Sequence, residues 1–289
     1  MPTFNMDFKT LTSPVGILRI LQVVFSCIAF SLVASVKAYN DPYGSWSMFT
    51  WCLCFAITIC IIVLELTGLC QNVPISWDDF TSAFSMLASL MLFTTSIMYP
   101  AVYLHGTCTG NSCGCRAGAT AMSILCFFAY AIEVGLTRAK PGEISGFLST
   151  IPGLLKVFQA YVTCVIFSLL PGSYTLAGIQ WCVAVYSICF IITTLIIILT
   201  IGRLLPRLPI NFEKILIGYN ILAVAMYITV AIMWPYYWFK KIPTRPSDPG
   251  QGQAWDNILG VTFLTYINLI AYIVDLVYST RMVFFVVPA

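Results

Sequence analysis

Four charged residues lie within or at the edge of long apolar segments, where a charge is costly unless it is paired, hydrated or able to reach the surface. Each half of the chain holds a basic residue followed by an acidic one: Arg19 with Glu133, and Lys156 with Asp275. Each basic residue stands near the start of an apolar segment and each acid near the end of one, at matching depth. The sequence therefore predicts one buried ion pair in each half. Two alternatives stay open: each basic side chain reaches the lipid headgroups alone, or the charges form an ion- or proton-conducting site.

Further polar residues accompany these charges. Gln22 and Gln159 each follow the basic residue by three positions, close to one helical turn, and so share its helix face. We expect them to donate hydrogen bonds between helices; a substrate-binding role is the alternative. Glu65 has no acidic counterpart in the second half. It either shares Arg19 with Glu133 or only marks the end of a helix.

Twelve cysteines and one histidine raise the question of metal or redox chemistry. Most of the cysteines fall inside apolar segments, where cysteine acts as a small hydrophobic residue. Cys108, Cys113 and Cys115 share one short loop, which predicts a disulfide between Cys108 and either Cys113 or Cys115, and no metal site. Cys70 stands at the end of an apolar segment, where it is either S-acylated or an unmodified thiol.

Composition excludes the function classes that need a water-exposed surface. Only 9% of the 289 residues are charged and 60% are hydrophobic, with a mean hydropathy of +0.91, whereas about 25% of a soluble domain is charged. A net charge of +3 provides no broad basic face for nucleic acid. A single histidine excludes most metal chemistry. We expect an integral membrane protein that is not an enzyme and holds no metal or cofactor.

Charge-free windows of about 17 to 25 residues mark the segments that can cross a bilayer. The uncharged stretch between Lys156 and Arg203 is long enough for two helices, with a turn at Pro171-Gly172. Pro100 and Pro235 are expected to end the third and seventh helices. The other predicted spans are Ile20–Val36, Pro42–Leu64, Phe80–Leu104, Ala117–Ile132, Ile215–Phe239 and Asn257–Val274, the last extending to Thr280.

The two halves of the chain repeat one another. When Arg19 is aligned with Lys156, the glycines three positions earlier, the glutamines three positions later and a cysteine and a Phe-Ser-Leu triplet further on all coincide. Every later span also finds its partner in order, as expected for a duplicated four-helix module. The matches are Trp51-Cys52 with Trp181-Cys182, Ile97–Pro100 with Ile232–Pro235, and Ala129–Glu133 with Ala271–Asp275.

We therefore predict an all-α integral membrane fold of eight transmembrane helices, arranged as two tandem four-helix bundles. Because each copy has an even number of helices, both copies have the same orientation. Lysines and arginines are more numerous on the side that holds both termini, which predicts cytoplasmic N- and C-termini. The predicted parts are a cytoplasmic segment 1–12, a first domain 13–138, a cytoplasmic linker 139–148, a second domain 149–285 and a tail 286–289.

The chain resembles a known family in its repeated pattern. A basic residue opens the first helix of each copy, and Ala-Tyr-x-x-acid stands near the end of the fourth, at Glu133 and Asp275. This pattern resembles the MARVEL domain of tetraspan trafficking proteins, and two such domains in one chain resemble the myeloid-associated differentiation marker family. The resemblance covers roughly Leu11 to Phe285 and carries over no catalytic residue.

The resemblance implies a non-enzymatic multi-pass protein of the plasma membrane and of trafficking vesicles. It implies a role in organising cholesterol-rich membrane domains, in trafficking, or in junctional and cortical architecture. The expected partners are the bilayer, proteins bound at the loops and a second copy of the chain, and not nucleic acid. The alternative function is a small-solute or ion transporter. We disfavour it because no Asp, Glu, Lys or Arg stands near the centre of a predicted span.

Overall fold

The computed structural model describes residues 9–104, 110–138, 146–171, 176–204, 212–241 and 243–284. Within these ranges, eight helices are long and apolar enough to cross a membrane. The chain divides into a first unit, Met1–Ser149, and a second unit, Thr150–Ala289.

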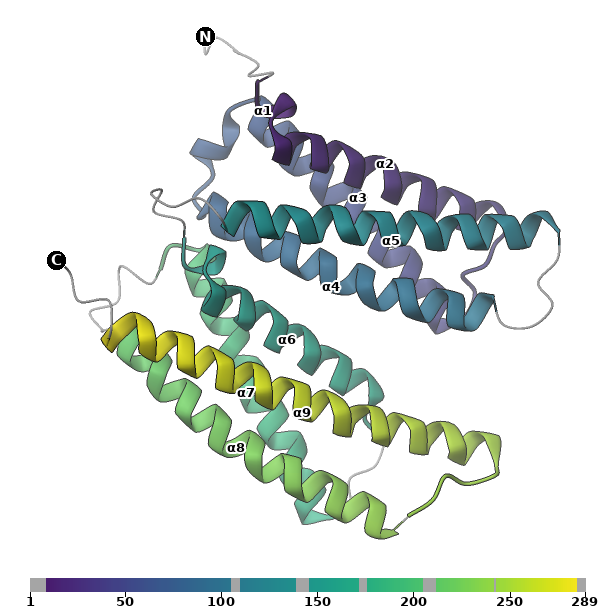
Figure 1. Cartoon of the computed structure of the whole chain (residues 1–289), viewed down its shortest axis with the longest axis vertical. Coiled ribbons are helices and arrows are strands. Elements are labelled where there is room, and N and C mark those ends of the chain that lie inside the picture. The colour runs from purple at the N-terminus through teal and green to yellow at the C-terminus, as the bar shows by residue number, and fades with distance from the viewer. Residues whose placement is uncertain are drawn as a thin grey trace. The chain divides into compact units, whose positions relative to one another are not determined.

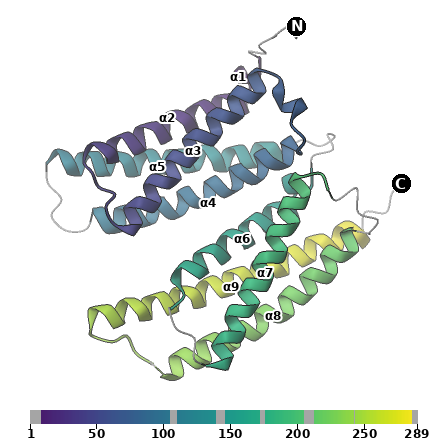
Figure 2. The same ribbon diagram turned by 180° about the vertical axis from the view of Figure 1, so that it is seen from behind.

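Each unit is a bundle of four long helices (Figures 1 and 2). In both units every long helix packs against its neighbours in sequence, and the first also packs against the last, which closes the bundle. The first unit contains α1 (Lys9–Thr12), α2 (Pro14–Ser35), α3 (Pro42–Leu66), η1 (Leu69–Asn72), α4 (Trp77–Tyr103), α5 (Asn111–Arg138) and η2 (Phe147–Ser149). The second unit contains α6 (Ile151–Leu169), α7 (Ala177–Ile201), α8 (Phe212–Lys241) and α9 (Pro249–Phe284).

Three of these helices begin with a polar cap followed by proline within two residues. Ser13 caps α2, Asp41 caps α3 and Thr150 caps α6, each accepting a hydrogen bond from a backbone N–H of the first turn. The cap satisfies one of the free N–H groups at the start of a helix, and proline fits there because it has no N–H to lose. The equivalent helices α2 and α6 therefore begin with the same combination of cap and proline at equivalent positions of the two units.

The prediction that Pro100 and Pro235 end their helices was wrong. Both lie inside helices, since α4 continues to Tyr103 and α8 to Lys241. A proline removes the hydrogen bond to the carbonyl four residues earlier, which must then find another donor in a membrane interior. In α8 that carbonyl belongs to Ala231, and the hydroxyl of Tyr266 donates to it at 3.1 Å. A neighbouring helix thus compensates for the proline.

The repeat alignment of the second span was also wrong. Trp51 is fully buried, whereas Trp181 is 44% exposed. The buried counterpart of Trp51 is Tyr186: Trp51 donates to Ser123 at 3.1 Å, and the Tyr186 hydroxyl pairs with Thr265 at 2.6 Å. The matching Trp-Cys pairs in the sequence are therefore not equivalent in the structure.

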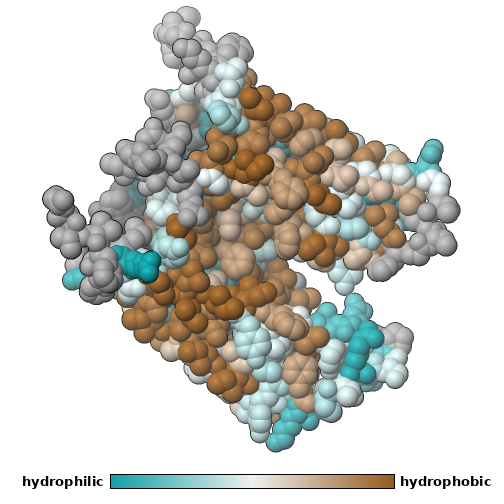
Figure 3. All heavy atoms as spheres, viewed as in Figure 1, coloured by the Kyte–Doolittle hydropathy of each residue, from teal (hydrophilic) through white to brown (hydrophobic). Residues whose placement is uncertain are grey.

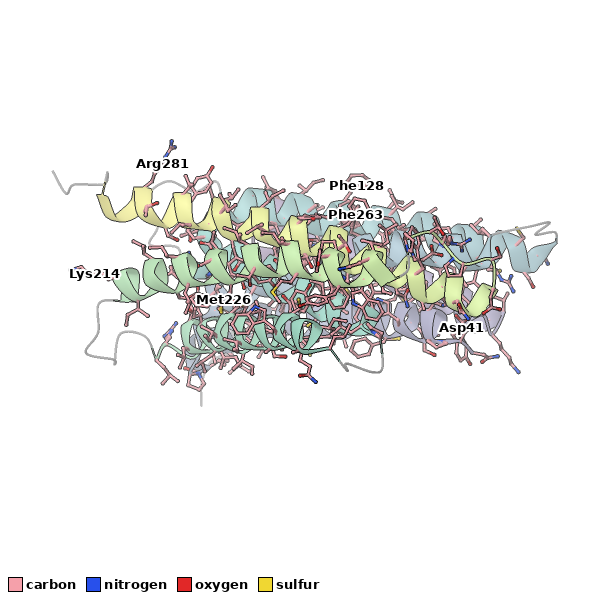
Figure 4. The ribbon with its side chains drawn as sticks, turned by 90° about the horizontal axis from the view of Figure 1, so that it is seen from below. Asp41, Phe128, Lys214, Met226, Phe263 and Arg281 are labelled. Carbon is pink, nitrogen blue, oxygen red and sulfur yellow. The ribbon has the colours of Figure 1, made fainter. Side chains whose placement is uncertain are left out.

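Large apolar side chains cover the outside of the helices in both units (Figure 3). Isoleucine, leucine and phenylalanine residues that are exposed in the isolated chain are the expected lipid-facing surface of a bundle that crosses a bilayer. Charged residues gather at helix ends; Lys214 at the start of α8 and Arg281 near the end of α9 lie at the same end of the second unit (Figure 4). The interiors, in contrast, contain many buried polar side chains.

Candidate functional site: a buried charge cluster in each unit

The first cluster joins α2, α3 and α5. Arg19, on α2, is buried, and its Nε donates to Glu133 Oε1 on α5 at 2.9 Å. Gln22, one turn along α2, donates from Nε2 to the other carboxylate oxygen of Glu133 at 2.6 Å. Both oxygens of a buried carboxylate are thus satisfied from the same helix face.

Glu65 supplies a second carboxylate to the same arginine. Arg19 Nη1 donates to Glu65 Oε2 on α3, and the indole of Trp77 donates to Glu65 Oε1 at 3.0 Å. The side chain of Glu65 is 17% exposed, against 2% for Glu133. Of the two alternatives for Glu65, the structure shows the one in which Glu65 shares Arg19 with Glu133. One guanidinium faces two carboxylates, so the first cluster carries a formal charge of −1.

The second cluster joins α6, α8 and α9. Lys156 Nζ lies 2.8 Å from Asp275 Oδ2, and both side chains are 0% exposed. The ammonium also donates to Asn220 Oδ1 at 2.5 Å and to Gln159 Oε1 at 3.3 Å. Gln159 Nε2 and Ser279 Oγ donate to Asp275 at 2.9 and 3.1 Å. One cation and one anion are present, so the second cluster is formally neutral.

Aromatic rings and amides extend the second cluster into the bundle. Lys156 Nζ lies 4.7 Å from the ring centroid of Tyr219 and 5.4 Å from that of Tyr272. Such cation–π contacts stabilise a desolvated ammonium. One turn deeper on α9, Asn268 donates to the Tyr227 hydroxyl at 2.7 Å and to Thr163 at 3.1 Å. This second group of polar side chains is joined to the cluster through the backbone carbonyl of Gln159, which accepts from Asn268 and Thr163.

The two clusters are related by the repeat but differ in how the cation is satisfied. Arg19 and Lys156 occupy one position, and Glu133 and Asp275 another. In the first unit the additional acceptor comes from the second helix, whereas in the second unit it comes from the third. The two units can be aligned on their buried aromatic residues. In this alignment the equivalent pairs are Glu65 with Thr200, Ser85 with Asn220, Phe84 with Tyr219 and Cys126 with Asn268.

The geometry of the clusters favours a structural role. Every charged group in them has an opposite charge within hydrogen-bond distance and additional hydrogen-bonding partners. No group of three metal-ligating side chains occurs among the residues that the structure describes. The clusters connect the first helix of each unit to the last, which is the contact that closes each bundle.

Comparison with known proteins agrees with this architecture. The model of the membrane-associating domain, MARVEL, matches twice, over residues 10–136 and 147–278. Myeloid-associated differentiation marker of Rattus norvegicus is 44% identical over 292 residues, covering 96% of this chain and 92% of the relative. This chain belongs to the myeloid-associated differentiation marker family.

Other members of the family show similar agreement. The human myeloid-associated differentiation marker is 43% identical over 290 residues, covering 96% of this chain and 90% of the relative. Myeloid-associated differentiation marker-like protein 2 of Xenopus laevis is 43% identical over 289 residues, covering 96% and 95%. No solved structure matches the chain. The two units are thus MARVEL domains, and the protein is a multi-pass membrane protein.

Of the four cysteines singled out in the sequence, the structure describes Cys70, Cys113 and Cys115. Cys113 is disulfide-bonded and Cys115 is a free thiol, so the alternative bridge through Cys115 is not formed. Cys108 lies outside the described residues. Cys70 is a partly exposed free thiol in η1, and its S-acylation stays a prediction.

A separate charge pair lies at the other end of the second MARVEL domain. Arg245 donates from Nε and Nη2 to the two carboxylate oxygens of Asp256, at 2.9 and 2.8 Å. Hydrogen bonding to this carboxylate raises the pKa of Arg245. Both side chains are exposed, so the pair holds the segment before α9 with little gain in stability.

Sequence reasoning missed several members of the clusters. Asn220 and Asn268 stand inside apolar runs, and the cost of an amide in a membrane interior could have marked them as it marked the charges. Ser279 and Trp77 carried no such signal, because hydroxyl and indole groups are common at helix ends. Their roles depend on the neighbouring helix.

Proposed function

We propose that this protein is a non-enzymatic organiser of cholesterol-rich domains of the plasma membrane, acting through its lipid-facing helices, with protein partners bound at its loops. The observation that carries the proposal is the pairing of the intramembrane charges within each bundle. Because Arg19, Lys156, Glu133 and Asp275 are all engaged inside their own domain, the surface left for lipid is apolar.

A rigid apolar surface of this kind suits a protein whose function is to contact lipid. The closed clusters lock the first helix of each domain to the last, and so hold the lipid-facing side chains in a fixed arrangement. Ordered acyl chains next to sterols pack better against a rigid protein surface than against a mobile one, because dispersion attraction requires that atoms stay in close contact. The family's domain name, membrane-associating, is compatible with this role.

Detergent-resistant flotation tests the proposal. The full-length tagged protein is expressed in cells, and its buoyant fraction is measured with and without cholesterol extraction, beside a transmembrane protein that stays outside such domains. We expect cholesterol-dependent flotation. The double variant Lys156→Met/Asp275→Asn, which opens the second cluster, should float less at equal expression. Complete solubility of the unmodified protein would contradict the proposal.

One observation favours a second candidate, a transporter or proton pathway. A set of hydrogen bonds runs through the second MARVEL domain from Ser279 to Asn268, with the backbone carbonyl of Gln159 as its link to Asn268. The eleven steps along α9 from Asn268 to Ser279 correspond to about 16 Å at 1.5 Å per residue, roughly half of a 30 Å hydrocarbon core. The remaining half contains the isolated pair of Tyr186 and Thr265.

The half-length network fits a structural role better than conduction. Conduction requires a relay across the whole core. Flux of protons and small ions into vesicles that contain the purified chain separates the two functions. Flux that Asn268→Leu abolishes would establish the pathway in place of the structural role.

A further inference from the structure

A group of buried polar atoms in the first MARVEL domain has no hydrogen-bond partner among the residues that the structure describes. The group consists of the hydroxyls of Thr95, Tyr99 and Tyr103 on α4 and Nε of Arg116 on α5. Each such atom costs free energy when it is buried without a partner. Thr95 and Tyr99 are fully buried.

These residues lie together at one end of the bundle. The three α4 residues are spaced by four positions and share one face of the helix. The rings of Tyr99 and Tyr103 are 4.7 Å apart, and the Arg116 guanidinium lies 5.5 Å from the ring centroid of Tyr103. Arg116 Nη1 donates to the Tyr103 carbonyl at 3.4 Å, which fixes the side chain and leaves Nε unused.

The backbone of α3 makes room for this arrangement. A Cβ atom on Gly44 would lie 2.3 Å from the Tyr103 hydroxyl, so only glycine allows that hydroxyl to turn into the bundle. Asp41, the cap of α3, is close by but accepts from the N–H groups of Tyr43 and Gly44. Among the described residues, no carboxylate forms an ion pair with Arg116.

The second MARVEL domain keeps only part of this group: the indole Nε1 of Trp238 is also buried without a partner among the described residues, but no arginine accompanies it. The positions equivalent to Thr95, Tyr99, Tyr103 and Arg116 hold Val230, Trp234, Trp238 and Ile258. The indole of Trp234 donates to the carbonyl of Ile258 at 3.3 Å, so the position equivalent to Tyr99 is satisfied within the protein. The first domain therefore differs from the second in having a guanidinium and two phenol groups together at this position, where the second has Ile258 and two tryptophans.

We propose that Arg116, Tyr99 and Tyr103 bind the phosphate of a phospholipid headgroup. A guanidinium and two phenols are hydrogen-bond donors, and a phosphate offers several charged acceptor oxygens to such a set. Tyr103 is the last residue of α4, and its hydroxyl lies against the first turn of α3, so the site is at the level of the helix ends. This is the level at which a membrane-spanning bundle meets the headgroups, which favours a lipid phosphate over a free one.

Thermal unfolding of the purified full-length chain in detergent tests this site. The midpoint is measured with added phosphatidylcholine, with a phosphate-free galactolipid of the same acyl chains, and with inorganic phosphate. We expect phosphatidylcholine to raise the midpoint with saturation and the galactolipid to have no saturable effect. Tyr103→Phe and Arg116→Ile should each weaken the response to phosphatidylcholine at least about tenfold, because each removes a hydrogen bond to a charged group.

The controls separate binding from folding. Tyr103→Phe removes an oxygen that has no partner in the described part of the chain, so without lipid this variant should be as stable as the unmodified chain or more stable. Trp238→Phe, at the equivalent position of the second domain, should leave the lipid response unchanged. Equal responses to both lipids, or an unchanged phosphatidylcholine response in Tyr103→Phe and Arg116→Ile, would overturn the proposal. A response to inorganic phosphate but not to phosphatidylcholine would show that the site binds free phosphate and not a lipid headgroup.

Discussion

Replacing Lys156 by methionine should lower the free energy of unfolding of the second MARVEL domain by about 3 kcal/mol. Removing one partner of a buried pair costs about 3 to 5 kcal/mol because the other charge stays buried without compensation. Here the pair is 2.8 Å apart and fully buried. Asp275 would keep two neutral donors, from Gln159 and Ser279, which sets the expected loss at the lower end of that range.

The reciprocal variant, Asp275→Asn, should cost less, about 2 kcal/mol. The ammonium of Lys156 would still donate to Asn220 and Gln159 and face two tyrosine rings, and these contacts offset part of the lost attraction. The double variant Lys156→Met/Asp275→Asn buries no charge at this site. We expect its free energy of unfolding to fall by about 3 kcal/mol, whereas the two single losses sum to about 5 kcal/mol. The difference is a coupling energy of about 2 kcal/mol between the two residues.

Reversible unfolding in mixed detergent micelles measures these differences for the four proteins of the cycle. Losses that add to within about 0.5 kcal/mol would refute the pairing and favour a lysine that reaches the headgroups on its own. The matched cycle in the first domain is Arg19→Met with Glu133→Gln. Its coupling should be smaller, because Arg19 keeps Glu65 when Glu133 is neutralised.

Three further changes probe the first domain. Glu65→Gln should cost less than about 1 kcal/mol of unfolding free energy, since the side chain is partly exposed and its removal leaves the cluster neutral; a loss of 3 kcal/mol in micelle unfolding would contradict this. Gly44→Ala should lower the unfolding midpoint and the yield of folded protein, because the added Cβ would lie 2.6 Å from the backbone of Tyr39; an unchanged midpoint would be inconsistent with that contact. Asp79→Leu should speed hydrogen exchange of the Leu148 amide at least tenfold, since this N–H donates to Asp79 at 2.7 Å; equal exchange rates would show that another acceptor protects it.

The sequence was sufficient to predict which helices form and which charges share a depth. Charge-free windows and the length needed to cross a bilayer gave eight helices, and position along a helix brought Arg19 level with Glu133 and Lys156 level with Asp275. Depth follows from counting residues, because the rise per residue of a helix is fixed.

Rotation about the helix axis was harder to predict. The third partner of each cation depends on which neighbouring helix turns a polar residue toward it, Glu65 in one domain and Asn220 in the other. The same limit explains the misalignment of Trp51 with Trp181, since an identical dipeptide says nothing about which side of the helix faces the core. The prediction for Pro235 was wrong for a related reason, because a neighbouring helix supplies a donor to the Ala231 carbonyl.

The pairing of the first helix with the last also sets an order of events during biosynthesis. The ribosome makes Arg19 long before Glu133, and the two hydrogen-bonded residues are separated by 114 positions. Until the fourth helix enters the membrane, the arginine has only Glu65, from the second helix, as a carboxylate partner. Among the described residues of the second domain, Lys156 has no carboxylate partner until α9 arrives, because the residue equivalent to Glu65 is a threonine. The second domain therefore depends more strongly on completion of the chain, and truncation within α9 exposes an unpaired lysine to quality control.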